Sequence, residues 1–93
     1  MDFFQKNLKE TIEAINKLID NNVTIVNAKR IRRCNNIKSS NRSKINFIWR
    51  ALKYLEDQGI LRLNGITNPK TYKIISREKI DADDFLANNG KRE

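Results

Sequence analysis

The stretch SSNRSKINFIWRALKYLEDQGILRLNGITNPKTYKII, residues 39–75, decides the fold. Its first three residues are all suited to cap a helix, because their side-chain oxygens can accept hydrogen bonds from free backbone amides. Gly59, followed by an apolar residue, is a common helix stop. These signals predict a helix over residues 41–58.

A β-hairpin is expected directly after this helix. Residues 60–63 and 71–75 are two short β-prone runs. The turn dipeptides Asn64-Gly65 and Asn68-Pro69 lie between them. This connection is too long for a two-residue turn. We therefore predict a hairpin over residues 60–75 with a long loop, which projects as a wing.

The helix over residues 41–58 has two different faces. At about 100 degrees per residue, one apolar stripe predicts its core contacts, made by Ile45, Ile48, Leu52 and Leu55. The opposite face is centred near Arg50. It also carries Ser43, Asn46, Phe47, Lys53 and Tyr54. A surface of hydroxyl, amide, basic and aromatic groups suits phosphates and base edges.

Upstream, three further elements are expected. Apolar residues at helical spacing, from Phe4 to Ile19, predict an amphipathic helix over residues 2–20. Residues 23–26 are a β-branched run that we expect to pair with the later hairpin. Asn27 can cap a second helix over residues 28–36, AKRIRRCNN, whose crowded cations favour a neighbouring anion.

Composition excludes several classes of function. The chain has 93 residues, which allows one domain, and it contains one cysteine and no histidine. Zinc fingers, disulfide frameworks and histidine-dependent catalysis are therefore excluded. Cys34 is expected to be a small core residue, and Asp81, Asp83 and Asp84 are spaced like charges at a helix start. We expect no enzyme activity, no cofactor and no metal site.

The excess of positive over negative charge is confined to the centre of the chain. Of the net charge of +8, residues 29–73 contribute +10, with twelve Lys and Arg against two acids. Residues 1–28 and 74–93 each carry −1. General solubility would scatter such charge, whereas a nucleic-acid surface needs it in one place. This distribution favours a polyanionic partner.

The segment INFIWRALKYLEDQGILRL, residues 45–63, resembles the recognition helix and first wing strand of the winged helix-turn-helix family. As an architecture the likeness covers roughly residues 4–75. It implies an α+β fold with a three-helix core, a short strand and a C-terminal hairpin wing, in a domain of residues 1–75. It also implies that the third helix enters the major groove, the second lies across the backbone, and the wing touches an adjacent groove or phosphates.

The resemblance assigns residues to two kinds of DNA contact. Candidates for reading bases are Ser43, Asn46, Phe47 and Arg50. Asn46 suits adenine and Arg50 suits guanine, because each side chain can bind that base with two hydrogen bonds. Candidates for contacting phosphates are Arg30, Arg33, Lys38, Ser40, Asn41, Arg42, Lys44, Lys53, Arg62, Lys70 and Lys73.

Three functions remain open from the sequence. The first is a sequence-specific double-stranded DNA-binding protein acting as a transcriptional regulator. The second is a winged-helix accessory subunit of a replication, transcription or segregation complex that binds a protein partner through Phe47, Trp49 and Tyr54. Trp49 is otherwise expected to cover the edge of the core. The third is nonspecific coating of DNA.

The last segment, residues 76–93, is an acidic tail or a short helix. Asp81 can cap such a helix and Gly90 can end it. The helix would dock on the first helix or pair with a second copy, in a homodimer through residues 2–20 and 80–88. No run is long and apolar enough to span a bilayer, and the N-terminus lacks the order of a signal peptide, so a cytoplasmic or nuclear location is expected.

Overall fold

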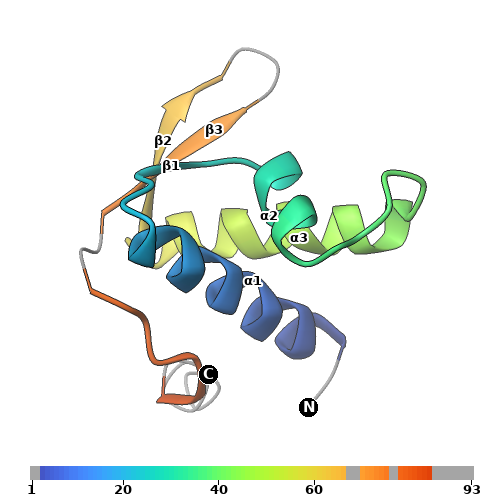
Figure 1. Ribbon diagram of the computed structural model, residues 1–93, viewed down its shortest axis with the longest axis horizontal. Coiled ribbons are helices and arrows are strands. Elements are labelled where there is room, and N and C mark those ends of the chain that lie inside the picture. The colour runs from blue at the N-terminus through green and yellow to red at the C-terminus, as the bar shows by residue number, and fades with distance from the viewer. Residues whose placement is uncertain (1–2, 67–69, 76–77, 85–93) are drawn as a thin grey trace.

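The computed structural model describes residues 3–66, 70–75 and 78–84 (Figure 1). The fold is α+β, with helices packed beside one antiparallel sheet. Its elements, in chain order, are α1 (Phe3–Asp20), β1 (Ile25–Val26), α2 (Ala28–Cys34), α3 (Arg42–Asp57), β2 (Leu61–Gly65) and β3 (Thr71–Ile74). The hairpin of β2 and β3 projects from the helices on the side away from α1 (Figure 1).

Local side-chain and backbone chemistry sets the helix boundaries. Asn27 Oδ1 accepts a hydrogen bond from the amide of Arg30 at 2.8 Å, so Asn27 is the N-cap of α2, as predicted. Asn41 has the same role in α3, where its Oδ1 accepts from the amide of Lys44 at 3.2 Å. The α3 boundaries therefore confirm the predicted helix to within one residue at each end.

Gly59 ends α3 in a Schellman motif. Its φ is +81°, in the left-handed region that favours glycine. Its amide donates to the carbonyl of Glu56 at 3.0 Å, and the amide of Ile60 donates to the carbonyl of Leu55 at 2.9 Å. These two bonds satisfy carbonyls at the helix end and turn the chain directly into β2.

The sheet has the order β1-β3-β2, and both pairings are antiparallel. The predicted pairing of the early strand with the hairpin is confirmed, although the strand is limited to Ile25–Val26. The prediction that Asn64-Gly65 forms part of the turn was wrong, because both residues belong to β2. A register shift between Leu63 and Gly65 brings Gly65 opposite Thr71. Asn68-Pro69 lies outside the described residues.

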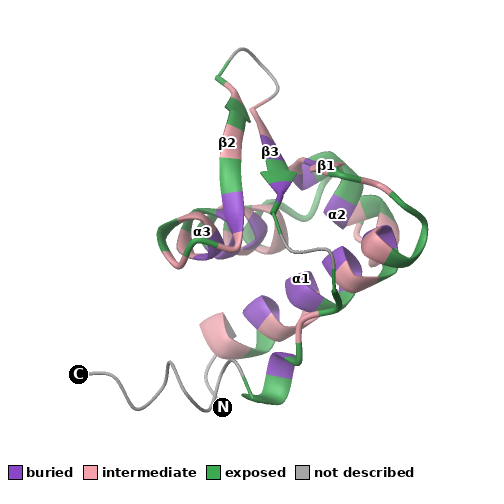
Figure 2. Cartoon of the chain, turned by 90° about the vertical axis from the view of Figure 1, so that its left-hand side faces the viewer, coloured by how far each residue is buried: buried purple, intermediate pink, exposed green. Residues whose placement is uncertain are grey.

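The hydrophobic core lies where the three helices meet the base of the hairpin (Figure 2). Ile12, Ile31, Leu52 and Tyr72 are each at most 1% exposed. The predicted core stripe of α3 is confirmed at Ile48, Leu52 and Leu55, whereas Ile45 is only half-buried. Cys34, which was expected to be a small core residue, is half-buried and packs against this core.

The described part of the C-terminal segment docks on α1. Asn16 and Ile80 exchange two hydrogen bonds: the Asn16 side-chain amide donates to the Ile80 carbonyl at 2.8 Å, and the Ile80 amide donates to Asn16 Oδ1 at 2.7 Å. Lys9 forms an ion pair with Asp83 at 2.9 Å. Asp81 Oδ1 accepts from the Asp84 amide at 3.0 Å, as predicted for a helix cap. Gly90 and the rest of residues 85–93 lie outside the described residues.

Within the described ranges, no helix has the length and apolar character needed to cross a membrane.

Candidate nucleic-acid interface

The outward face of α3, defined here as Ser43, Asn46 and Arg50, is exposed along its whole length. These residues recur at spacings of three and four, so they lie along one side of the helix. The buried residues Ile48 and Leu52 lie on the opposite side. The structure therefore brings a hydroxyl, an amide and a guanidinium together on one solvent-facing ridge.

Arg50 is held on this ridge by an aromatic contact. Its guanidinium carbon lies 5.8 Å from the centre of the Phe47 ring, a cation–π geometry. The Phe47 residue is half-buried. This contact limits the conformations of the Arg50 side chain, and Arg50 remains exposed to solvent.

Cations of α2, of the turn that follows it and of the first residue of α3 are exposed. Arg33, Lys38 and Arg42 are exposed, as are Ser40 and Asn41 beside them. Within the described ranges, none of these three cations forms an ion pair. Their charge is therefore available to an outside anion.

Two other arginines of the second helix have structural contacts. Arg30 is exposed, and its Nη1 donates to the carbonyl of Ile25 at 3.2 Å. Arg32, which the sequence did not single out, donates from Nη1 to the carbonyl of Ile37 at 2.9 Å. Arg32 thereby fastens the turn between α2 and α3. Arg30 keeps the second helix against β1.

The structure places Lys44 in the contact between α1 and α3. Its Nζ lies 3.0 Å from Asn7 Oδ1 and 3.1 Å from Glu10 Oε1. Asn7 is only 4% exposed, whereas the side chains of Lys44 and Glu10 are 33% and 36% exposed, so the ammonium lies at the edge of the contact between α1 and α3. Lys44 therefore does not belong to the cations that face solvent around the ridge.

Lys53 is exposed but its charge is offset locally. Its Nζ lies 3.4 Å from Asp57 and 3.7 Å from Glu56, on the same helix. The hydrogen bond to Asp57, together with the charges of Asp57 and Glu56, raises the pKa of Lys53 above its ordinary value. The C-terminal half of the ridge is therefore less positive than its N-terminal half.

The basic residues of the hairpin divide between the two faces of the sheet. Arg62 and Lys73 are direct cross-strand partners and both are exposed. Lys70 has its ammonium 5.8 Å from the centre of the Tyr72 ring, and Tyr72 belongs to the buried face. Because successive side chains alternate across a sheet, Arg62 and Lys73 lie on the opposite face from Lys70. The sequence did not separate these two groups.

An aromatic groove, defined here as Phe4, Trp49 and Tyr54, runs beside the ridge. It borders a pocket of about 460 Å³ that Arg50 and Lys53 also line. Trp49 packs against the core, which confirms that it covers the core edge. Tyr54 was placed on the outward face by its helical phase, but its ring packs edge-on against Phe4, with centres 5.8 Å apart and an interplanar angle of 84°.

Within the described ranges, no three His, Cys, Asp or Glu side chains gather into a set that could hold a metal ion. Comparison with known proteins gives no relative: no family model matches the chain, and searches of curated proteins and of solved structures found no match.

Proposed function

We propose that the chain is a winged helix-turn-helix protein that binds double-stranded DNA through α3 and acts as a transcriptional regulator. The observation that carries this proposal is the outward face of α3, where Ser43, Asn46 and Arg50 are exposed together. Two exposed cations without ion pairs in the described structure support it: Arg42 begins α3, and Arg33 lies on the preceding helix α2.

The dimensions of α3 support insertion into the major groove. The helix has 16 residues, which at 1.5 Å per residue is about 24 Å. The major groove is about 12 Å wide and admits an α-helix. The short helix α2 precedes α3, and the hairpin follows it, in the order that the winged helix-turn-helix arrangement requires.

Each part of the surface then has a distinct role. Arg50 would read guanine and Asn46 would read adenine, with Ser43 contributing a further hydrogen bond at the N-terminal half of α3. Phosphate contacts would position the helix without specifying sequence. We assign these contacts to the exposed residues Arg33, Lys38, Ser40, Asn41 and Arg42 and, in the wing, to the half-buried Lys70.

Selection from a randomised duplex pool tests this function. The bound fraction should converge on a short motif that this chain prefers over scrambled duplex. A regulator requires such a preference, because nonspecific contacts to phosphate alone give equal affinity for all sequences. Retention of the pool without enrichment would favour nonspecific coating of DNA. No retention at low salt would exclude both sequence-specific binding and coating.

The aromatic groove favours a second candidate, an accessory subunit that binds a protein partner. Aromatic side chains and arginine are enriched at the centres of protein interfaces. Here Trp49 and Tyr54 border an open pocket next to Arg50. On this alternative Trp49→Ala, rather than Arg50→Ala, would abolish the capture of a specific protein, while duplex binding would be weak in the unmodified chain.

A further inference from the structure

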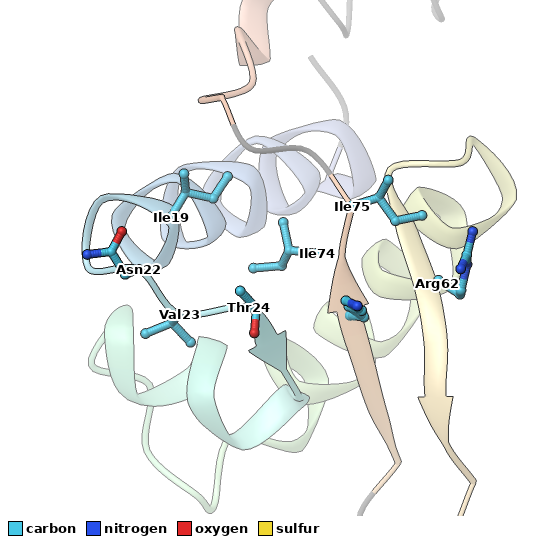
Figure 3. Close-up of a pocket in the computed structure, with 8 residues that line it drawn as sticks. Ile19, Asn22, Val23, Thr24, Arg62, Ile74 and Ile75 are labelled. Atoms are coloured by element: carbon cyan, nitrogen blue, oxygen red, sulfur yellow. The ribbon is translucent and has the colours of Figure 1, made fainter.

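A second pocket lies where the end of α1 meets β2 and β3. We call it the sheet pocket (Figure 3). Its volume is about 710 Å³, within the range of about 300–1,000 Å³ that is usual for small-molecule sites. Its walls come from the end of α1, residues 22–24, and strands β2 and β3.

One wall of the sheet pocket is apolar and is fixed by backbone hydrogen bonds. Ile19, Val23, Ile74 and Ile75 line it. The Ile74 amide donates to the Thr24 carbonyl at 2.7 Å, which fastens residues 22–24 to the end of β3. Ile75 is 45% exposed, so it offers apolar surface to an occupant.

The pocket is also lined by two cations that belong to directly paired residues of the sheet. Arg62 and Lys73 are cross-strand partners in β2 and β3, and both line the pocket. Like charges directly opposite each other destabilise a sheet. Within the described ranges, no ion pair involves either side chain. An anion bound between them would remove this repulsion.

We propose that the sheet pocket binds a small molecule in which an oxyanion is attached to a compact apolar group. Arg62 and Lys73 bind the oxyanion, which is a carboxylate or a phosphate, through charge-assisted hydrogen bonds. The apolar group rests on Ile75 and Val23. Thr24, whose side chain also lines the pocket, offers a hydroxyl to orient the ligand.

The sheet pocket does not depend on the proposed DNA surface. Lys70, the wing residue assigned to DNA, lies on the Tyr72 face of the hairpin, whereas Arg62 and Lys73 lie on the opposite face. Lys70→Gln is therefore a matched control for Lys73→Gln, because each removes one charge from the same strand region but from a different face.

An amide chemical-shift titration of this chain can use four probes: phenyl phosphate, benzoate, inorganic phosphate and benzyl alcohol. Phenyl phosphate or benzoate should bind saturably and shift the amides of Thr24, Arg62 and Lys73. Inorganic phosphate lacks the apolar group and benzyl alcohol lacks the charge, so each should bind roughly tenfold more weakly. The preference between the first two probes identifies the oxyanion.

Lys73→Gln and Arg62→Gln should each weaken this binding by roughly tenfold, while Lys70→Gln leaves it unchanged. Without ligand, Lys73→Gln should raise the melting temperature, because it removes the repulsion with Arg62. Absence of saturable binding by either anionic probe, or binding that Lys73→Gln and Arg62→Gln leave intact, would overturn the inference.

A duplex titration separates this inference from the proposed function. Suppose that the probes do not bind and that Lys73→Gln weakens duplex binding as much as Lys70→Gln does. Arg62 and Lys73 would then contact the DNA backbone, so the small-molecule inference would fail while the DNA-binding proposal would stand. If the probes bind but no duplex does, the DNA-binding proposal fails and the sheet pocket stands.

Discussion

The guanidinium of Arg50 lies 5.8 Å from the Phe47 ring centre, and the two residues are three positions apart on α3. The ring limits the motion of the side chain before any partner binds, which reduces the entropy lost on binding. Arg50→Ala should therefore cost roughly 1 to 3 kcal/mol on a preferred duplex and much less on random duplex. Fluorescence anisotropy with both duplexes measures the difference.

Lys53→Ala is the matched control for this substitution. Lys53 lies on the same helix and is exposed, but Asp57 and Glu56 already offset its charge. Its removal should change affinity for the preferred duplex far less than Arg50→Ala does. Equal losses from Arg50→Ala on preferred and random duplexes would contradict a base-reading role.

Lys70 is expected to contact phosphate without reading sequence. Lys70→Ala should weaken binding to all duplexes alike and should reduce the slope of log affinity against log salt by about 0.9. A salt series with the unmodified protein and the variant provides both slopes. A loss confined to one sequence would instead mean that the wing reads bases.

Lys44 should contribute to stability rather than to DNA binding. Lys44→Met removes the donor to Asn7 Oδ1 and the ion pair with Glu10. Because the lysine side chain is 33% exposed, solvent screens the ion pair, and we expect a loss of about 1 to 2 kcal/mol in the free energy of unfolding. Urea denaturation measures this loss.

Arg42→Ala should have effects on stability and DNA binding that are opposite to those of Lys44→Met. Arg42 lies two positions before Lys44 and is exposed. Its substitution should leave the urea midpoint nearly unchanged but weaken duplex binding, whereas Lys44→Met should do the reverse. If Lys44→Met weakened duplex binding more than Arg42→Ala without loss of stability, the lysine would belong to the DNA surface.

Substitutions at Gly59 should lower stability because of its backbone conformation, and not because a side chain would clash with its neighbours. A Cβ built at Gly59 meets no atom within 4 Å, but the φ of +81° is costly for residues with a side chain. Gly59→Ala should lower the free energy of unfolding by about 1 to 2 kcal/mol. Gly59→Asn should cost less, because asparagine tolerates this region. Thermal denaturation compares them, and equal stability of Gly59→Ala and the unmodified protein would contradict this explanation.

The sequence predicted those features that local chemistry controls. The Asn27 cap and the Gly59 stop depend on a few neighbouring residues, and the structure confirms both. The bulge beside Asn64 was missed, because a register shift depends on the partner strand and not on the turn dipeptide alone.

Long-range contacts explain the remaining differences at the candidate site. Lys44 meets Asn7, 37 positions earlier, and Tyr54 meets Phe4 on a different helix. The helical phase of α3 indicates which side a residue faces, but not which side chain of α1 extends to meet it. The exposure of Asn46 and Arg50 was predicted because it follows from that phase alone.

Amide chemical-shift mapping of this chain with a selected duplex tests the central claim most directly. The account predicts saturable changes at Ser43, Asn46 and Arg50, with further changes at Arg42 and at Lys70 in the hairpin. Changes confined to Trp49 and Tyr54, or no saturable change with any duplex at low salt, would contradict it.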